Sequence, residues 1–113
     1  FKDRKLDELV LIDLMATSEN VNFNFNILDE VASECNMPLI IGGGIKNIND
    51  VETAFKKGAD KIIVGSAGIK NNNFLDVIVK NFGSQSLVAA IDMKKINNKY
   101  SIFIDPNQRI LSL

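Results

Sequence analysis

The chain has 113 residues, of which 46% are hydrophobic and 24% charged, and its formal net charge is −1. This composition is typical of one globular domain, and it gives no electrostatic reason to expect a nucleic acid or an anionic membrane as a partner. Because there is no histidine and only one cysteine, Cys35, we expect no metal site, no internal disulfide and no histidine-activated nucleophile, and we expect a reducing, cytoplasmic location.

The first half of the chain is predicted to form two strands with a helix between them. Glu8–Leu14 (ELVLIDL) is an apolar run closed by an acid, which is typical of a buried parallel strand. Apolar residues then recur at helical spacing over Asn24–Cys35, which places Cys35 on the buried face of a helix. Pro38 ends that segment and precedes a second strand at Leu39–Ile41.

The second half continues this alternation of helices and strands. Asn47 is a good helix N-cap, Gly58 suits the position after a helix, and Asn97-Asn98 is a turn signal. The predicted elements, in chain order, are a helix at Ile48–Lys57, a strand at Lys61–Val64, a helix at Asn73–Phe82, a strand at Leu87–Ile91 and a strand at Tyr100–Ile104. The face of the helix at Asn73–Phe82 that we expect to be buried carries Phe74, Leu75, Ile78, Val79 and Phe82.

Alternating strands and helices imply a parallel sheet with right-handed crossovers. Two architectures fit this pattern, an open doubly wound sheet and a (β/α)₈ barrel, and both carry their functional groups at the carboxyl ends of the strands. The residues of interest at those ends are Asp13, Gly42–Gly44, Gly65-Ser66 and Asp92. Their shared placement is the main functional signal in the residues themselves.

The glycine triplet in LIIGGGIKN lies between a predicted strand and a predicted helix. Glycine allows positive φ and a close approach of the backbone to a ligand, and free N–H groups near a helix N-terminus bind anions. The pattern is GGGI and not GxGxxG, so a single phosphate is favoured over a dinucleotide, and no cofactor is expected. The alternative is a tight strand-to-helix turn with no ligand.

Four charged residues also lie at strand ends. Asp92 closes the run LVAAI, where it is expected to be partly desolvated and suited to proton transfer, or else to cap the next turn as a solvated acid. Asp13 has the same placement with a weaker case. Glu8 and Lys61 lie at the opposite, amino-terminal ends, where they would line the bottom of a barrel or simply be exposed.

Three segments resemble the cyclase subunit family of imidazole glycerol phosphate synthase. They are DELVLIDL, MPLIIGGGIKNINDVETAFKKGADKI and FGSQSLVAAIDMKK, and the similarity runs over about Asp7–Phe103. The resemblance implies that residues 1–113 form one partial (β/α)₈ barrel domain with the second to fifth strands of the family fold and the hairpin that follows.

The resemblance also implies an activity. In this family the cyclase takes ammonia from a glutaminase subunit and uses it on a bisphosphorylated ribulosyl substrate to form imidazole glycerol phosphate, a step of histidine biosynthesis. Asp92 matches one of two aspartates that act as general acid and base. Asp13, Gly43, Gly44, Gly65 and Ser66 match substrate- or phosphate-binding positions, and Glu8 and Lys61 match charged residues of the ammonia gate that faces the partner.

The chain departs from the family pattern where hydroxyl or amide groups are usual. Ile63-Val64-Gly65-Ser66-Ala67 stands for a segment with an asparagine and further hydroxyls, Met15 and Ile40 replace polar residues, and Ile104-Asp105-Pro106-Asn107 follows the hairpin. Two alternatives to the histidine-pathway enzyme therefore stay open. One is a related protein that channels ammonia for acetamidino-sugar formation in surface-polysaccharide synthesis. The other is a non-catalytic, phosphate-binding barrel fragment, since we expect these 113 residues to be inactive alone.

Overall fold

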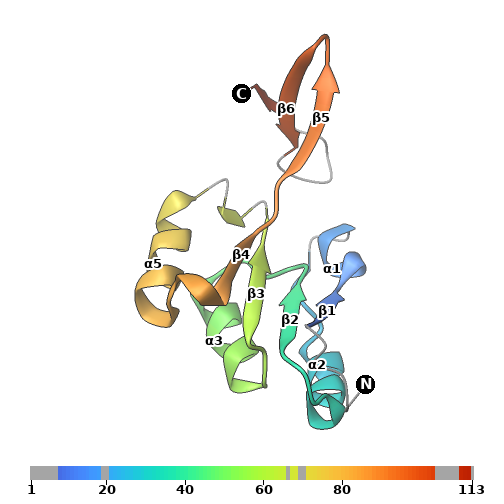
Figure 1. Ribbon diagram of the computed structural model, residues 1–113, viewed down its shortest axis with the longest axis vertical. Helices are drawn as coiled ribbons and strands as arrows, with labels where there is room; N and C mark the ends of the chain where they lie inside the picture. Colours follow the sequence, from blue (N-terminus) through green and yellow to red (C-terminus); the bar gives the residue numbers. More distant parts are fainter. Residues whose placement is uncertain (1–7, 19–20, 66, 69–70, 104–109, 113) are drawn as a thin grey trace.

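The computed structural model describes residues 8–18, 21–65, 67–68, 71–103 and 110–112, and Figure 1 shows how their elements are arranged. Four parallel strands lie in one sheet in the order β1-β2-β3-β4, and three antiparallel strands form a second sheet in the order β5-β6-β7. The elements are β1 (Leu9–Ile12), α1 (Leu14–Ser18), α2 (Phe25–Glu34), β2 (Leu39–Gly42), α3 (Ile48–Lys56), β3 (Lys61–Val64), α5 (Asn72–Phe82), a 3₁₀ turn η1 (Ser84–Ser86), β4 (Leu87–Ala89), β5 (Asp92–Ile96), β6 (Lys99–Phe103) and β7 (Ile110–Ser112).

The topology decides between the two predicted architectures. Strands that are consecutive in the chain are neighbours throughout the parallel sheet, with Leu9 opposite Leu39 and Ile40 opposite Lys61. A doubly wound sheet reverses its strand order at a switch point and carries helices on both faces, whereas barrel units follow one another in one direction. The described strands therefore form part of a (β/α)₈ barrel, as predicted.

Asparagine side chains fix the start of each longer helix. Asn24, Asn47 and Asn71 are the N-caps of α2, α3 and α5, and each side chain accepts a hydrogen bond from a backbone N–H in the first turn. Such a bond satisfies one of the amide groups that a helix start leaves without an intrahelical partner. Gly58 and Gly83 follow α3 and α5 with φ of 113° and 89°, which suits glycine at the end of a helix.

All three longer helices pack on one face of the parallel sheet. This core joins strand residues to helix residues in one cluster, whose fully buried members include Leu28, Leu39, Ile41, Val51, Ile62, Val64 and Ile78. Because side chains alternate along a strand, the opposite face carries Val10, Ile12, Ile40, Ile63 and Val88, and we call it the inner face. On the inner face Val10 and Ile12 of β1 are 49% and 50% exposed, whereas Ile40 of β2 is 6% exposed.

The prediction of a fully buried first strand is therefore wrong for β1, which is the edge strand of the sheet and is exposed at Leu9, Val10 and Ile12. The apolar run is the kind that needs cover on both faces, but the described residues cover only the helix side. The prediction of a fully buried apolar face on α5 is also wrong at Val79, which is 39% exposed, whereas Phe74 and Ile78 on that face are buried.

Two boundary predictions are also wrong. The strand predicted at Leu87–Ile91 stops at Ala89, although the Ala90 N–H still donates to the Val64 carbonyl oxygen at 2.9 Å, and the chain then enters the hairpin. Cys35 is not a core residue, because α2 ends at Glu34 and Cys35 has extended backbone with its thiol donating to the Met37 carbonyl oxygen at 3.2 Å. The predicted Asn97-Asn98 turn is confirmed, with φ of 51° and 64°.

The two faces of the sheet predict different costs for the same substitution. Ile41→Ala empties a fully buried site among the helices and should lower the free energy of unfolding by about 2–5 kcal/mol, whereas Ile12→Ala at a half-exposed site should cost about 1 kcal/mol or less. Urea unfolding of both variants measures this difference. Equal costs would mean that the inner face at Ile12 is covered in solution, contrary to the structure.

Candidate functional site

The carboxyl ends of β1 and β2 meet at the glycine turn, which we define as Gly43–Gly44. Both residues have positive φ, 92° and 84°. A Cβ on Gly43 would clash with the Asp13 carbonyl oxygen, and one on Gly44 would lie 2.6 Å from the Phe23 nitrogen and 2.8 Å from the Val21 carbonyl oxygen. No side chain fits at such distances from backbone atoms, so both glycines are required by the packing of the chain itself.

Asp13 holds the segment that crosses this turn. Its Oδ1 accepts a hydrogen bond from the Ala16 N–H at 3.0 Å, and its Oδ2 accepts one from the Asn24 N–H at 2.9 Å. The Asp13 N–H in turn donates to the Gly42 carbonyl oxygen at 2.9 Å, extending the β1–β2 ladder to the edge of the turn. The carboxylate thus fastens the start of α1 and the start of α2 to the end of β1.

The first turn of α3 is capped from within the chain. The Asn47 side chain accepts from the Asp50 N–H at 2.9 Å, and the Asp50 Oδ2 accepts from the Lys46 N–H at 3.0 Å. Asp50 is 4% exposed and already places a carboxylate at the positive end of the helix dipole. An anion on this edge of the sheet would therefore be held by the backbone of the glycine turn more readily than by the first turn of α3.

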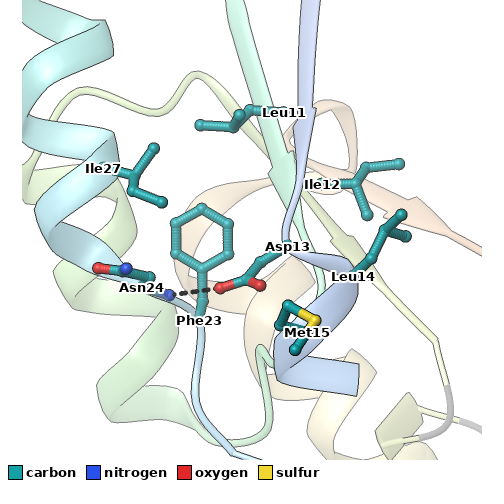
Figure 2. Close-up of a pocket in the computed structure, with 8 residues that line it drawn as sticks. All are labelled: Leu11, Ile12, Asp13, Leu14, Met15, Phe23, Asn24 and Ile27. Atoms are coloured by element: carbon teal, nitrogen blue, oxygen red, sulfur yellow. Dashed lines mark hydrogen bonds between the residues drawn. The ribbon is translucent and has the colours of Figure 1, made fainter. Parts of the chain in front are cut away.

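A pocket of about 220 Å³ lies beside Asp13 at the free edge of β1. Figure 2 shows its lining, which is apolar apart from Asp13 and Asn24 and comprises Leu11, Ile12, Leu14, Met15, Phe23 and Ile27. The Asp13 carboxylate points across it toward the Asn24 backbone. This lining suits an apolar group and gives no cationic side chain for a phosphate.

Gly65 ends the third strand and differs from the glycine turn. Among the described residues, a Cβ on Gly65 would meet only the Ala90 carbonyl oxygen, at an ordinary 3.7 Å, so their packing does not require glycine there. The Gly65 carbonyl oxygen accepts from the Gly68 N–H at 3.0 Å, which turns the chain after β3. Ser66, which was predicted as a binding position together with Gly65, lies outside the described residues.

Asp92 does not close the fourth parallel strand as predicted. It is the first residue of β5, opposite Phe103 in the antiparallel sheet, and it is exposed. Figure 1 shows the hairpin leaving the carboxyl end of β4, so Asp92 stands where the chain passes from one sheet to the other. The expected partial desolvation is therefore wrong for the described residues, since nothing in them covers the side chain.

Glu8 and Lys61 come together at the amino-terminal end of the sheet. The Lys61 Nζ donates to the Glu8 Oε1 at 3.0 Å, although the two residues belong to β3 and to the approach of β1 with β2 between them. Lys61 pairs in register with Ile40, so both charged side chains lie on the inner face. The pair is partly exposed, and such pairs add little to stability.

One structural acid was missed by the sequence reasoning. The Asp60 Oδ2 accepts from the Leu39 N–H at 2.8 Å, and the Asp60 N–H donates to the Leu39 carbonyl oxygen at 2.8 Å. This reciprocal pair ties the start of β2 to the start of β3. The signal was an acid directly before a strand in GADK, where an aspartate side chain is able to bind a backbone amide.

Within the described residues, no group of three or more His, Cys, Asp or Glu side chains is arranged to hold a metal ion. In the same residues no helix is long and apolar enough to cross a membrane.

Comparison with known proteins matches residues 1–109 to the family described as histidine biosynthesis protein. Three curated relatives carry the name imidazole glycerol phosphate synthase subunit HisF. The relative from Dictyoglomus thermophilum is 46% identical over 93 residues, 82% of this chain and 37% of its own length. Those from Campylobacter concisus and Sulfolobus acidocaldarius are 40% and 36% identical and cover 93% and 91% of this chain. The chain spans about two fifths of the length of these relatives, 42% and 41% for the last two.

Alanine substitution should change the free energy of unfolding by different amounts at Gly44 and at Gly65. Gly44→Ala forces a Cβ into backbone atoms at positive φ and should lower the free energy of unfolding by roughly 2–4 kcal/mol. Gly65→Ala has room and should change it by less than about 1 kcal/mol. Thermal and urea unfolding of both variants checks this, and an unaffected Gly44→Ala variant would refute the close crossing at the turn.

Proposed function

This chain belongs to the histidine biosynthesis protein family, and from that premise we propose that it is part of an ammonia-using cyclase that forms imidazole glycerol phosphate. The observation that carries the proposal is the family match over residues 1–109, together with relatives named as a subunit of that synthase. In this proposal residues 1–113 are one partial barrel domain of a cytoplasmic enzyme, and the parallel sheet supports it by having barrel connectivity.

The substrate is proposed to bind along the carboxyl ends of the strands. The backbone of Gly43 and Gly44 would hold one phosphate, with Gly65 and Ser66 after the neighbouring strand β3 contributing to the same rim. One fact supports this placement: Gly65 has no side chain where the packing of the described residues would permit one. Backbone N–H groups at positive-φ glycines are suited to anions.

Asp92 is proposed as one of the two proton-transfer groups. Its carboxylate would accept a proton from the substrate or return one to it, and its exposure at the end of β4 leaves it accessible to a bound molecule. One carboxylate cannot be both the acid and the base in a single step. The second group would come from outside these 113 residues, and for that reason we propose that the chain alone is inactive.

The opposite end of the sheet is proposed to face a glutaminase partner. Two observations support this: the relatives are named as subunits, and Glu8 and Lys61 form an ion pair at the amino-terminal end of the sheet, which in this proposal is the entry for ammonia. Above the pair the inner face is apolar, with Val10, Ile12 and Ile40 leading toward the carboxyl end. An ion pair able to open, followed by an apolar path, would admit a small neutral molecule and exclude ions.

A second candidate is ammonia channelling for acetamidino-sugar formation. One observation favours it: Leu14 and Met15, next to Asp13 at the carboxyl rim, are 74% and 60% exposed. Apolar side chains at these positions provide none of the hydroxyl donors that a polar ribotide substrate would use. The Glu8–Lys61 end serves either candidate equally well.

A chimera tests the proposal. Residues 1–109 would replace the matching segment of the Campylobacter concisus relative, and the chimera would be assayed with ammonium salt and the bisphosphorylated ribulosyl substrate. We expect turnover by the chimera and none by the 113-residue chain alone. Asp92→Asn in the chimera should lower kcat by about 10²–10⁴-fold, the usual contribution of a positioned acid or base.

The control is Asp76→Asn, which removes an exposed carboxylate from α5 and should leave kcat unchanged. An Asp92→Asn chimera as active as its parent would remove Asp92 from the mechanism. A folded chimera that binds the substrate but shows no turnover would favour the second candidate or a non-catalytic phosphate-binding fragment.

A further inference from the structure

Asp13 makes more contacts than a helix cap needs. An N-cap side chain satisfies one or two amide groups of the helix it precedes, and the Oδ1 bond to the Ala16 N–H already does this for α1. The Oδ2 bond reaches the Asn24 N–H, 11 residues further along the chain, at the N-cap of α2. One carboxylate therefore joins the two ends of the segment Leu14–Asn24.

That segment is what lies against the glycine turn. The Phe23 N–H donates to the Gly44 carbonyl oxygen at 3.3 Å, and a Cβ on Gly44 would meet the Ala16 Cβ at 2.7 Å and the Val21 carbonyl oxygen at 2.8 Å. Gly44 is thus enclosed from both arms of the segment, Ala16 on one side and Val21–Phe23 on the other. The conformation of the turn depends on where these arms are held.

Apolar packing supports part of the segment, because Ala16 and Phe23 are buried and Phe23 belongs to the core cluster. Leu14 and Met15 are largely exposed, and α1 is only five residues long, so it is too short to be stable without tertiary contacts. The Ala16 and Asn24 bonds to the carboxylate, with the Val21 N–H bond to the Ala16 carbonyl oxygen at 2.9 Å, close the loop. Removal of the carboxylate would take a hydrogen-bond acceptor from both arms at once.

Electrostatics argue against a direct role for Asp13 in phosphate binding. A carboxylate repels a phosphate, and both Asp13 oxygens already accept hydrogen bonds from backbone N–H groups. We infer that Asp13 is a positioning residue, whose carboxylate sets the backbone of the Gly43–Gly44 turn through the segment Leu14–Asn24. Its bearing on phosphate rests on the proposed function, while its effect on the turn does not.

The test compares Asp13→Asn with Asp76→Asn in the full 113-residue chain. Asparagine keeps the shape but offers one acceptor oxygen in place of two, so one backbone N–H would face an NH₂ group. We expect amide hydrogen exchange of Phe23 to accelerate by about tenfold or more relative to Ile62 in the core of β3, and the Gly43 and Gly44 amide signals to shift. Asp76→Asn should change none of these.

Titration with inorganic phosphate, followed at the Gly43 and Gly44 amide signals, measures the phosphate affinity of the turn. Asp13→Asn should weaken the phosphate affinity by about fivefold or more if the turn is the anion site. If the wild-type chain binds no phosphate but Asp13→Asn still releases Phe23 and shifts the glycine signals, the proposed phosphate site is wrong and the positioning role stands. Phosphate binding at the turn with wild-type affinity in Asp13→Asn would overturn the inference.

Two further outcomes would overturn it: no change at Phe23 and Gly44, or equal acceleration at Phe23 and Ile62, since the latter would indicate only a general loss of stability. Should Asp13→Asn fail to fold, Asn24→Pro and Asn24→Ala replace it. Asn24 has φ of −80°, which proline adopts, and both variants lose the side-chain cap, but only proline loses the N–H bonded to Asp13. A shift of the Gly43 and Gly44 signals with proline and not with alanine supports the inference, and equal spectra refute it.

Discussion

The close crossing of two backbone segments at the Gly43–Gly44 turn is the constraint on which the rest of this structure depends. Asp13 continues the β1–β2 ladder up to Gly42. Backbone atoms of Asp13 and of Val21–Phe23 then lie so close to Gly43 and Gly44 that no side chain fits at either glycine. This crossing sets the start of α2, because Asn24 is both the N-cap of that helix and a hydrogen-bond donor to Asp13. The position of α2 over β1 and β2 follows from it.

The two faces of the parallel sheet differ in how they are packed. The helices bury Leu39, Ile41, Ile62 and Val64 on one face, in the close contact that gives large apolar side chains most of their stabilising effect. The inner face carries a second apolar set, which is exposed at Val10 and Ile12 of β1 and buried at Ile40 of β2. Barrel strands are normally covered on both faces, so the sequence pattern belongs to a larger assembly of strands than the four seen in the parallel sheet.

The two ends of the sheet carry different functional groups. The carboxyl end carries the Gly43–Gly44 turn and an exposed carboxylate at Asp92, while the amino end carries the Glu8–Lys61 pair. Acids at this sheet therefore act in different ways according to position: Asp13 and Asp60 bind backbone amides and hold strands and helices in place, whereas Asp92 stays exposed. The same residue type at a strand end is thus structural in two cases and a candidate for chemistry in one.

The sequence by itself determined the types of the parallel strands and of helices α2, α3 and α5, the Asn47 cap and the Asn97-Asn98 turn, because each depends on local spacing and on backbone preferences of a few neighbouring residues. Helix α1 and strand β7 were not predicted. Only the tertiary structure decided that β4 stops before Asp92, that Cys35 lies outside the core, and that both oxygens of Asp13 are used by backbone amides. These depend on which distant segments meet: the partner of Asp92 in the ladder is Phe103, and the partner of Asp13 is an amide across a loop. A sequence pattern carries no information on such distances. For that reason the glycine triplet suggested a ligand in the sequence, and only the structure showed that two backbone segments cross there.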